Sequence, residues 1–191
     1  MAIAPAATRA NVSRAEARPD PSGREYFDFV TSKKPENFSQ EELVTIIKKS
    51  IKIKSKIVKM DPREKDLRKV LNFGHTIGHA LESLSWKTAK PLLHGEAIAI
   101  GMIAESNLAS YNLVGCTAKD LILIKKAIVN AGLPVNIKNI NSTDIKKMIL
   151  SDKKNFHDKI NFSLPKRIGE ILVNISAEEN LIIKAIESIL I

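Results

Sequence analysis

The chain has 191 residues, of which 44% are hydrophobic and 5% aromatic, and its formal net charge is +9. This length fits one large domain, or a domain with a tail, whose core is aliphatic rather than aromatic. No apolar run approaches the roughly 18 residues that a membrane span needs, and the single cysteine excludes an internal disulfide. We therefore expect a cytoplasmic protein without a membrane segment.

The basic charge points to an anionic partner, but it is spread over predicted helices on which Lys alternates with Glu and Asp. No motif of a nucleic-acid-binding domain accompanies it. We expect no nucleic-acid partner, and the charge serves either a small anionic substrate or a solvated basic surface.

Residues 1–23 differ in composition from the rest of the chain. Ala, Arg, Pro and Ser dominate there and Lys is absent, whereas the following residues are rich in Lys, Ile and Asn. Such a composition is typical of a segment that does not pack into a core. We expect a disordered or non-native tail at 1–23 and a helical domain over 24–191, whose ordered part begins near Glu25.

The first long helix is predicted from Ser39, which forms a capping box with Glu42, to about Met60. Its apolar face comprises Leu43, Ile46, Ile47, Ile51 and Val58. Further helices are expected at about 68–84, 94–113, 117–131, 142–150 and from 176 onwards. The helix at 94–113 carries small side chains that permit close contact with a neighbouring helix, namely Ala97, Ala99, Gly101 and Ala104.

Local signals bound the later elements. Thr117 fits a helix N-cap, Gly132 fits the stop of the same helix, and Ser176 with Glu179 fits a second capping box. A polar loop is expected at 151–155. The segments 160–164 and 170–174 read as the two strands of a hairpin. The predicted fold is mainly α, with one small β-hairpin.

Two segments stand out for chemistry, 71–82 (LNFGHTIGHALE) and 94–102 (HGEAIAIGM), because they hold three of the four histidines. In a continuous helix over 68–84, the polar side chains at steps of four, three and four share one stripe. These side chains are Arg68, Asn72, His75 and His79. A polar stripe on an otherwise apolar helix indicates burial around a site.

The histidine pair leaves two interpretations open. His75 and His79 at i,i+4 can face one metal or one substrate, or they can be structural histidines bonded to backbone carbonyls. The zinc-protease motif does not fit, because Thr76 stands where that chemistry needs Glu. His94 at a helix start favours the metal interpretation, since a catalytic zinc takes three protein ligands and keeps an open position.

Together the two segments resemble 3-dehydroquinate synthase, and the resemblance runs from about Tyr26 to the C-terminus. The residues Arg63-Glu64, Leu67-Arg68 and Asp152-Lys153-Lys154-Asn155 fit the same family pattern. The resemblance implies the multi-helical C-terminal domain of the dehydroquinate synthase-like fold. It also implies a lyase of the shikimate pathway, and hence of aromatic amino acid biosynthesis, which cyclises a keto sugar acid phosphate with NAD and zinc and eliminates phosphate.

The resemblance also assigns roles to individual residues. It implies metal ligands (His75 and His94), acid–base residues (Glu64 and His79) and substrate contacts (Lys54, Arg68, Asn72 and Lys153). The metal is expected to be zinc or another divalent ion. The guanidinium of Arg68, buried on the stripe, is expected to require the anionic substrate as its counter-charge.

The family's N-terminal NAD-binding half has no counterpart in this sequence, which lacks a glycine-rich strand–turn–helix. Its third zinc ligand, a Glu, has no dependable match either, because the surroundings of Glu16 do not resemble the family segment. We expect a fragment or truncated product that binds no NAD and is inactive alone. A separate NAD-binding domain and homo-oligomerisation are the expected partners. Two rivals remain: another sugar-phosphate cyclase of the superfamily, and a non-catalytic helical module that binds metal or a partner.

Overall fold

The computed structural model describes residues 21–111, 114–152 and 160–191. In chain order the elements are α1 (Pro21–Val30), η1 (Pro35–Asn37), α2 (Gln40–Met60), η2 (Leu67–Asn72), α3 (His75–Ser85), α4 (His94–Tyr111), α5 (Ala118–Asn130), α6 (Ser142–Asp152), β1 (Asn161–Arg167), β2 (Glu170–Ser176) and α7 (Glu179–Glu187). The two strands pair antiparallel, and η1 and η2 are 3₁₀ helices. The predicted fold, mainly α with one small hairpin, is confirmed.

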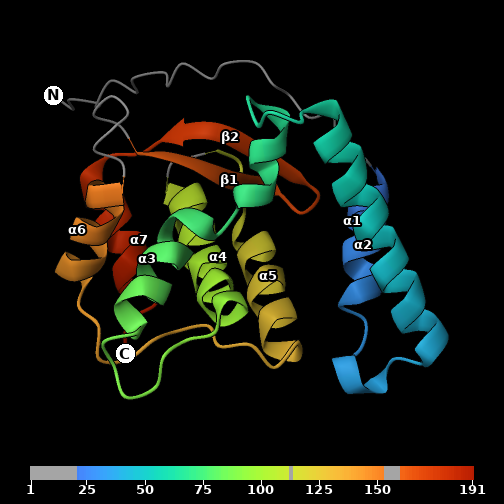
Figure 1. Cartoon of the computed structure of the whole chain (residues 1–191), viewed down its shortest axis with the longest axis horizontal. Helices are drawn as coiled ribbons and strands as arrows, with labels where there is room; N and C mark the ends of the chain where they lie inside the picture. Colours follow the sequence, from blue (N-terminus) through green and yellow to red (C-terminus); the bar gives the residue numbers. More distant parts are fainter. Residues whose placement is uncertain (1–20, 112–113, 153–159) are drawn as a thin grey trace, which may run out of the picture.

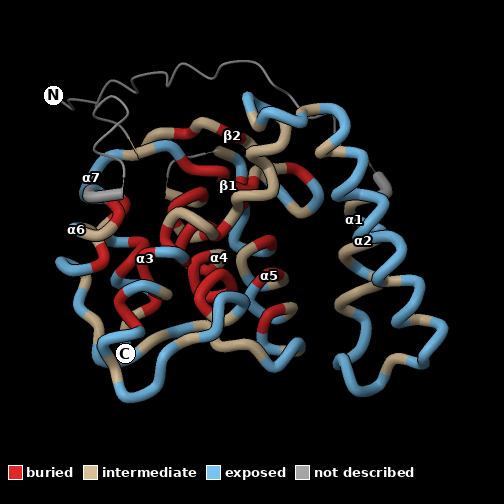
Figure 2. The backbone as a smooth tube through the Cα atoms, viewed as in Figure 1, coloured by how far each residue is buried: buried red, intermediate tan, exposed pale blue. Residues whose placement is uncertain are grey.

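Helix α4 lies at the centre of the core. It packs against α3, α5, α7 and β1, and Figures 1 and 2 show it surrounded by these elements and buried over most of its length. Its sequence is apolar around the whole circumference, which is the pattern of a helix enclosed on every side. The site described below is built on the end of this helix and on its neighbour α3.

Helices α1 and α2 form a pair beside this core (Figure 1). Tyr26 of α1 donates its hydroxyl to the carbonyl oxygen of Ile46 on α2, 2.9 Å away. The predicted apolar face of α2 is nevertheless not buried, since Leu43, Ile47 and Ile51 are 40%, 56% and 60% exposed. Only part of this face is covered, because the contact with α1 lies at Ile46, which is half-buried.

Most predicted element ends are confirmed. Ser39 and Glu42 form the expected capping box of α2, and Thr117 caps α5 together with Asp120. Gly132 follows α5 with φ of +73°, the left-handed conformation of a helix stop.

Among the described residues, no helix has the length and apolar character that a membrane span requires.

Three boundaries differ from expectation. The predicted capping box of Ser176 is wrong, because Ser176 still pairs with Asn161 in the hairpin and Glu178 becomes the N-cap of α7. Helix α6 extends to Asp152, so the expected polar loop does not begin at 151, and 153–155 lie outside the described residues. Helix α1 begins at Pro21, so residues 21–23, assigned to the tail, are helical. The division into tail and domain otherwise stays a prediction.

Candidate metal centre and anion site

The first motif is not one continuous helix, so the prediction of a helix over 68–84 is wrong. A 3₁₀ turn ends at Asn72, Phe73 and Gly74 form a turn, and α3 starts at His75. Gly74 separates the two pieces with φ of +84°, a left-handed conformation that glycine adopts without steric cost. The backbone therefore turns between Asn72 and His75, and the polar residues no longer form one helical stripe.

Glycines bring α3 and α4 into backbone contact. A Cβ on Gly101 would lie 2.1 Å from the carbonyl oxygen of Gly74 and 2.7 Å from the amide nitrogen of Gly78. A Cβ on Gly78 would lie 3.1 Å from the Cα of Ile98. These distances leave no room for a side chain, which confirms the close helix contact predicted for the small residues of α4. The contact sets His94, the first residue of α4, beside the histidines of α3.

Three imidazole rings converge at this point. The ring centroids of His75 and His79 are 5.3 Å apart, and His94 lies 5.9 Å from the former and 5.8 Å from the latter. One ligand nitrogen from each ring lies within 4.8 Å of the others. The structure thus brings together the two predicted metal ligands and adds His79, for which the resemblance implied an acid–base role.

Hydrogen bonds orient two of the three rings. The Nδ1 of His75 lies 3.2 Å from the carbonyl oxygen of Phe73, and the Nδ1 of His94 lies 3.0 Å from Oε2 of Glu82. In the neutral ring an acceptor of this kind holds the proton on Nδ1 and leaves the Nε2 lone pair free. Burial, reinforced by the neighbouring His79 and His94, holds the pKa of His75 below its usual value, against the opposing effect of Phe73. A low pKa keeps the ring neutral, the form that binds metal.

The donor set fits a zinc-like ion. Tetrahedral coordination at a Zn–N distance of about 2.0–2.1 Å separates the ligand nitrogens by roughly 3.4 Å. The three nitrogens all lie within 4.8 Å of one another, which is close to that spacing. Three imidazoles plus one open position is the arrangement of a catalytic rather than a structural site.

A second polar group lies on the segment between α2 and α3. Glu64 has φ of +52°, an uncommon conformation for a residue with a side chain. Its carboxylate accepts a hydrogen bond from Nδ2 of Asn72 at 2.7 Å and lies 3.5 Å from Nε of Arg68. Its charge also acts on His75. Three of the predicted site residues therefore meet beside the histidine cluster.

Arg68 is not the unpaired buried cation that the sequence suggested. Its side chain is 35% exposed, lies beside Glu64 and donates from Nη1 to the carbonyl oxygen of Pro62 at 3.1 Å. The prediction failed because the turn at Gly74 takes Arg68 off the axis of α3. A planar guanidinium partly open to solvent still suits a carboxylate or phosphate ligand.

Two predicted substrate contacts are not placed at this site. Lys54 is exposed on α2, and no ion pair or hydrogen bond is described for it. Lys153 lies outside the described residues. Both roles stay predictions.

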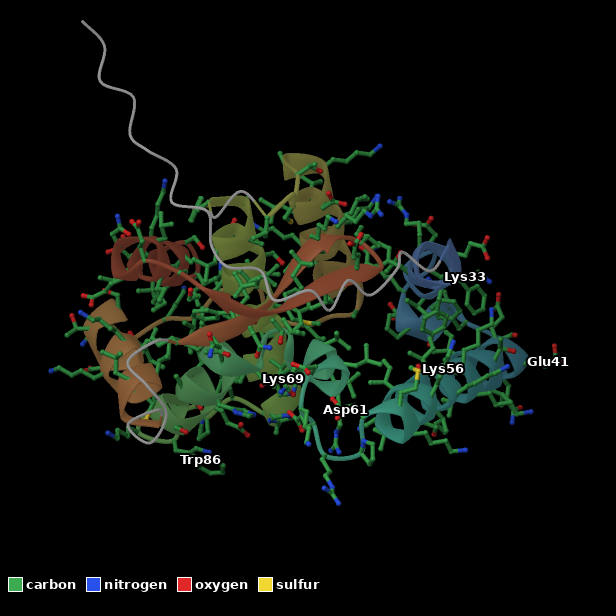
Figure 3. All side chains as sticks on the ribbon, turned by 90° about the horizontal axis from the view of Figure 1, so that it is seen from above. Lys33, Glu41, Lys56, Asp61, Lys69 and Trp86 are labelled. Atoms are coloured by element: carbon green, nitrogen blue, oxygen red, sulfur yellow. The ribbon has the colours of Figure 1, made fainter. Side chains whose placement is uncertain are left out.

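Three acidic residues that the sequence analysis overlooked hold the site together. Asp61 accepts backbone N–H bonds from Lys65, Asp66 and Arg68 at 3.0, 2.8 and 3.1 Å, and Figure 3 shows it where α2 gives way to η2. Glu82 contacts His94, and Glu105 accepts backbone hydrogen bonds at the start of α3. A signal for Glu105 was present, because a carboxylate in the interior of a mainly apolar helix needs a specific buried partner.

The turn that carries Arg68 is tied to the hairpin. Lys69 donates from Nζ to Oδ1 of Asn174 at 2.9 Å, and its carbonyl oxygen accepts from Ser163 at 2.7 Å. In Figure 3 Lys69 lies beside the strands. The small sheet thus supports the 3₁₀ turn that presents Arg68 and Asn72.

The chain is similar to proteins of known family along most of its length. A family model described as 3-dehydroquinate synthase C-terminal matches residues 22–155. The 3-dehydroquinate synthase of Thermodesulfovibrio yellowstonii is 40% identical over 162 residues, which is 82% of this chain and 44% of the relative. That of Thermoanaerobacter sp. (strain X514) is 43% identical over 154 residues, 79% of this chain and 41% of the relative. The chain therefore spans less than half the length of these relatives.

Solved structures share the fold. A 2-epi-5-epi-valiolone synthase from Streptomyces hygroscopicus subsp. jinggangensis 5008, with NAD⁺ and Zn²⁺ bound, aligns with a TM-score of 0.70 at 21% identity, over 87% of this chain and 46% of that one. A 2-deoxy-scyllo-inosose synthase complexed with carbaglucose-6-phosphate, NAD⁺ and Co²⁺ aligns with a TM-score of 0.67 at 21% identity, over 87% and 51%. At such identities the likeness establishes the fold alone. Through the match of its residues 22–155, the chain belongs to the 3-dehydroquinate synthase family, as a C-terminal domain.

Proposed function

We propose that this chain carries the metal- and substrate-binding half of a 3-dehydroquinate synthase. The reaction would be the shikimate-pathway cyclisation of a keto sugar acid phosphate, with phosphate elimination, in the cytoplasm. The observation that carries the proposal is the convergence of three histidines beside the Glu64, Arg68 and Asn72 group. The curated relatives support this reaction over that of another sugar-phosphate cyclase, since they are about twice as similar in sequence as the solved cyclases.

Within this proposal, His75, His79 and His94 would hold a divalent ion, with zinc the first choice. Such an ion supplies a Lewis acid that polarises a substrate oxygen. Arg68 and Asn72 bind and orient the anionic substrate, to which Lys54 and Lys153 add positive charge. The nearby carboxylate of Glu64, which the hydrogen bond from Asn72 holds in position, accepts a substrate proton.

The assignment of His79 has two versions with different chemistry. As a third metal ligand it completes the donor set that the geometry offers. As the acid–base residue implied by the family resemblance, it moves a proton while His75 and His94 hold the metal with one further ligand. Metal affinity separates the versions, because His79→Ala weakens binding as much as His75→Ala only in the first.

NAD chemistry would reside in a domain that the described residues do not contain. The described part of the chain has one antiparallel strand pair and no parallel sheet with a glycine-rich turn. Cofactors and substrates named for the structural relatives, which include NAD⁺, Zn²⁺ and a sugar phosphate analogue, support a site completed by such a domain. We propose that catalysis requires that second domain and that the chain alone is inactive.

Reconstitution tests the proposal. The chain is mixed with the separately produced N-terminal domain of a 3-dehydroquinate synthase, zinc and NAD, and phosphate release is followed with a keto sugar acid phosphate. Activity should need all four components and should fall at least 100-fold in His75→Ala and His94→Ala. The control is His157→Ala, which changes the one histidine outside the two motifs. Turnover of a sugar phosphate that lacks a carboxylate group would instead favour the reaction of another cyclase. Zinc binding that neither His75→Ala nor His94→Ala weakens would refute the metal centre.

A further inference from the structure

Helices α3 and α4 each carry a carboxylate that contacts the N-terminal end of the other helix. Glu105 of α4 accepts hydrogen bonds from the backbone N–H groups of Gly74, at 2.6 Å, and Ile77, at 3.1 Å, at the start of α3. Glu82 of α3 contacts the Nδ1 of His94, at 3.0 Å, at the start of α4. Each helix thus contacts the N-terminal end of the other, where His75 begins α3 and His94 begins α4.

Glu105 replaces the N-cap that α3 lacks. Gly74 occupies the cap position and has no side chain to accept a hydrogen bond. The carboxylate of Glu105, which is fully buried, supplies the acceptor from the neighbouring helix at the N-terminal end of α3. Because His75 is the first residue of α3, this contact fixes the height and rotation of the turn that presents His75 and, one turn later, His79.

Glu82 performs the corresponding task for His94. The imidazole of His94 is 57% exposed, so packing alone does not fix its orientation. The carboxylate of Glu82 is 28% exposed and emerges one turn beyond His79 on the same helix. A carboxylate on Nδ1 sets the ring plane, holds the proton on that nitrogen and raises the basicity of the free Nε2.

We propose that Glu105 and Glu82 are positioning residues that pre-organise the three-histidine cluster for its metal ion. The inference rests on the proposed metal centre and adds the residues that determine its affinity. Without either carboxylate, the chain occupies the binding-competent arrangement for a smaller fraction of the time, and the apparent dissociation constant rises by the inverse of that fraction. Partners of metal-bound histidines are typically worth about 10- to 100-fold in affinity.

The test is a zinc competition titration of the whole chain against a chromophoric chelator. Glu105→Gln keeps the shape but replaces one of the two accepting oxygens by an amide nitrogen, and should weaken zinc binding about 10-fold. Glu82→Leu should weaken it about 10- to 100-fold, while Glu82→Gln, which can still accept the Nδ1 proton, should restore most of the affinity. The visible spectrum of bound Co²⁺, which reports ligand number and geometry, should change in both Glu105→Gln and Glu82→Leu.

Asp120→Asn is the matched control for general destabilisation. Asp120 is also a buried capping carboxylate, 9% exposed, and it accepts the backbone N–H of Thr117 at 3.1 Å on α5, away from the cluster. This variant should lose stability without losing metal affinity or changing the Co²⁺ spectrum. If it weakens zinc binding as much as Glu105→Gln, the positioning role is refuted.

The remaining outcomes separate this inference from the proposed function. Folded Glu105→Gln and Glu82→Leu that bind zinc like the parent, while His75→Ala does not, would overturn the inference and leave the metal centre standing. A parent chain without zinc affinity would overturn both. If Glu105→Gln fails to fold, the partly exposed Glu82 decides the question, through the difference between its Leu and Gln variants.

Discussion

The backbone contact between α3 and α4 gives the sharpest prediction, which concerns Gly101→Ala. The added methyl group would lie 2.1 Å from the carbonyl oxygen of Gly74 and 2.7 Å from the amide nitrogen of Gly78. Both obstacles are backbone atoms, so no side chain can rotate away. Helix α3 would have to move outward by roughly 1 Å before the contact reached an ordinary van der Waals distance.

The expected loss follows from two opposing effects. Alanine is favoured over glycine inside a helix by about 1 kcal/mol. Overpacking a core costs typically about 1–3 kcal/mol when side chains can adjust, and more when they cannot. Because two backbone segments must separate, we expect a net loss of about 3 kcal/mol from a total stability of roughly 5–15 kcal/mol. The same movement separates His75 and His79 from His94, so zinc affinity should fall as well.

Urea unfolding followed by circular dichroism measures this loss, and Gly95→Ala supplies the control on the same helix. No atom lies within 4 Å of the position that a Cβ on Gly95 would take. That variant should therefore be at least as stable as the parent, with a gain smaller than the roughly 0.5–1 kcal/mol of a helix interior, because Gly95 is the second residue of α4. If Gly101→Ala unfolds at the same urea concentration as the parent, or gains stability as Gly95→Ala does, the helices do not approach as closely as described.

Three further predictions concern NAD binding, Cys116 and Asp61. Calorimetric titration should detect no binding of NAD to the chain alone, and micromolar affinity would contradict the assignment of that cofactor to another domain. Burial, with the charge of Asp120, raises the pKa of the Cys116 thiol to about 11, so at pH 8 about one thiol in a thousand is ionised. A disulfide reagent should therefore label Cys116 slowly in the native chain and rapidly in urea. Equal rates would show that the thiol is open to solvent. Backbone N–H groups of Arg68, Lys65 and Asp66 hold the pKa of Asp61 below its usual value. Its contribution to stability is therefore complete above the unfolded pKa of about 3.9 and is lost as the pH falls through the lower folded value. Asp61→Asn should reduce the fall of the melting temperature at acid pH, and an unchanged fall would assign it to other carboxylates.

Sequence reasoning was sufficient for elements whose ends are set by local chemistry. Ser39 and Thr117 each form a capping box with the residue three positions later. The motif and the helix end that it determines therefore lie in the same short segment. Ser176 offered the same local signal, yet its pairing with Asn161 across the hairpin prevailed. A contact that is distant in the sequence outweighed a correctly recognised motif.

The sequence predicted which residues lie near one another at the site, but not how they are arranged. Periodicity assigned Arg68, Asn72, His75 and His79 to one helix, because their spacing alone fits 3.6 residues per turn. The turn at Gly74 was not predictable from that spacing, since the acceptor for the Gly74 amide is Glu105, thirty-one positions further along the chain. What the pattern could establish was that these side chains share a neighbourhood, whereas their geometry depends on α4.

The two motifs, 71–82 and 94–102, together form one contact between helices. Helices α3 and α4 run antiparallel, and the contacts between them include Gly74 with Met102, Gly78 with Ile98, and Glu82 with His94. Each advance of four residues along α3 is matched by a retreat of four along α4, which is the step that keeps successive contacts on one face of a helix. The glycines set how near the helices lie, and the shared four-residue step then determines which residue His94 meets. The spacing of glycines and histidines within each motif therefore serves the contact between the motifs, and the metal centre forms at the end of that contact where α4 begins.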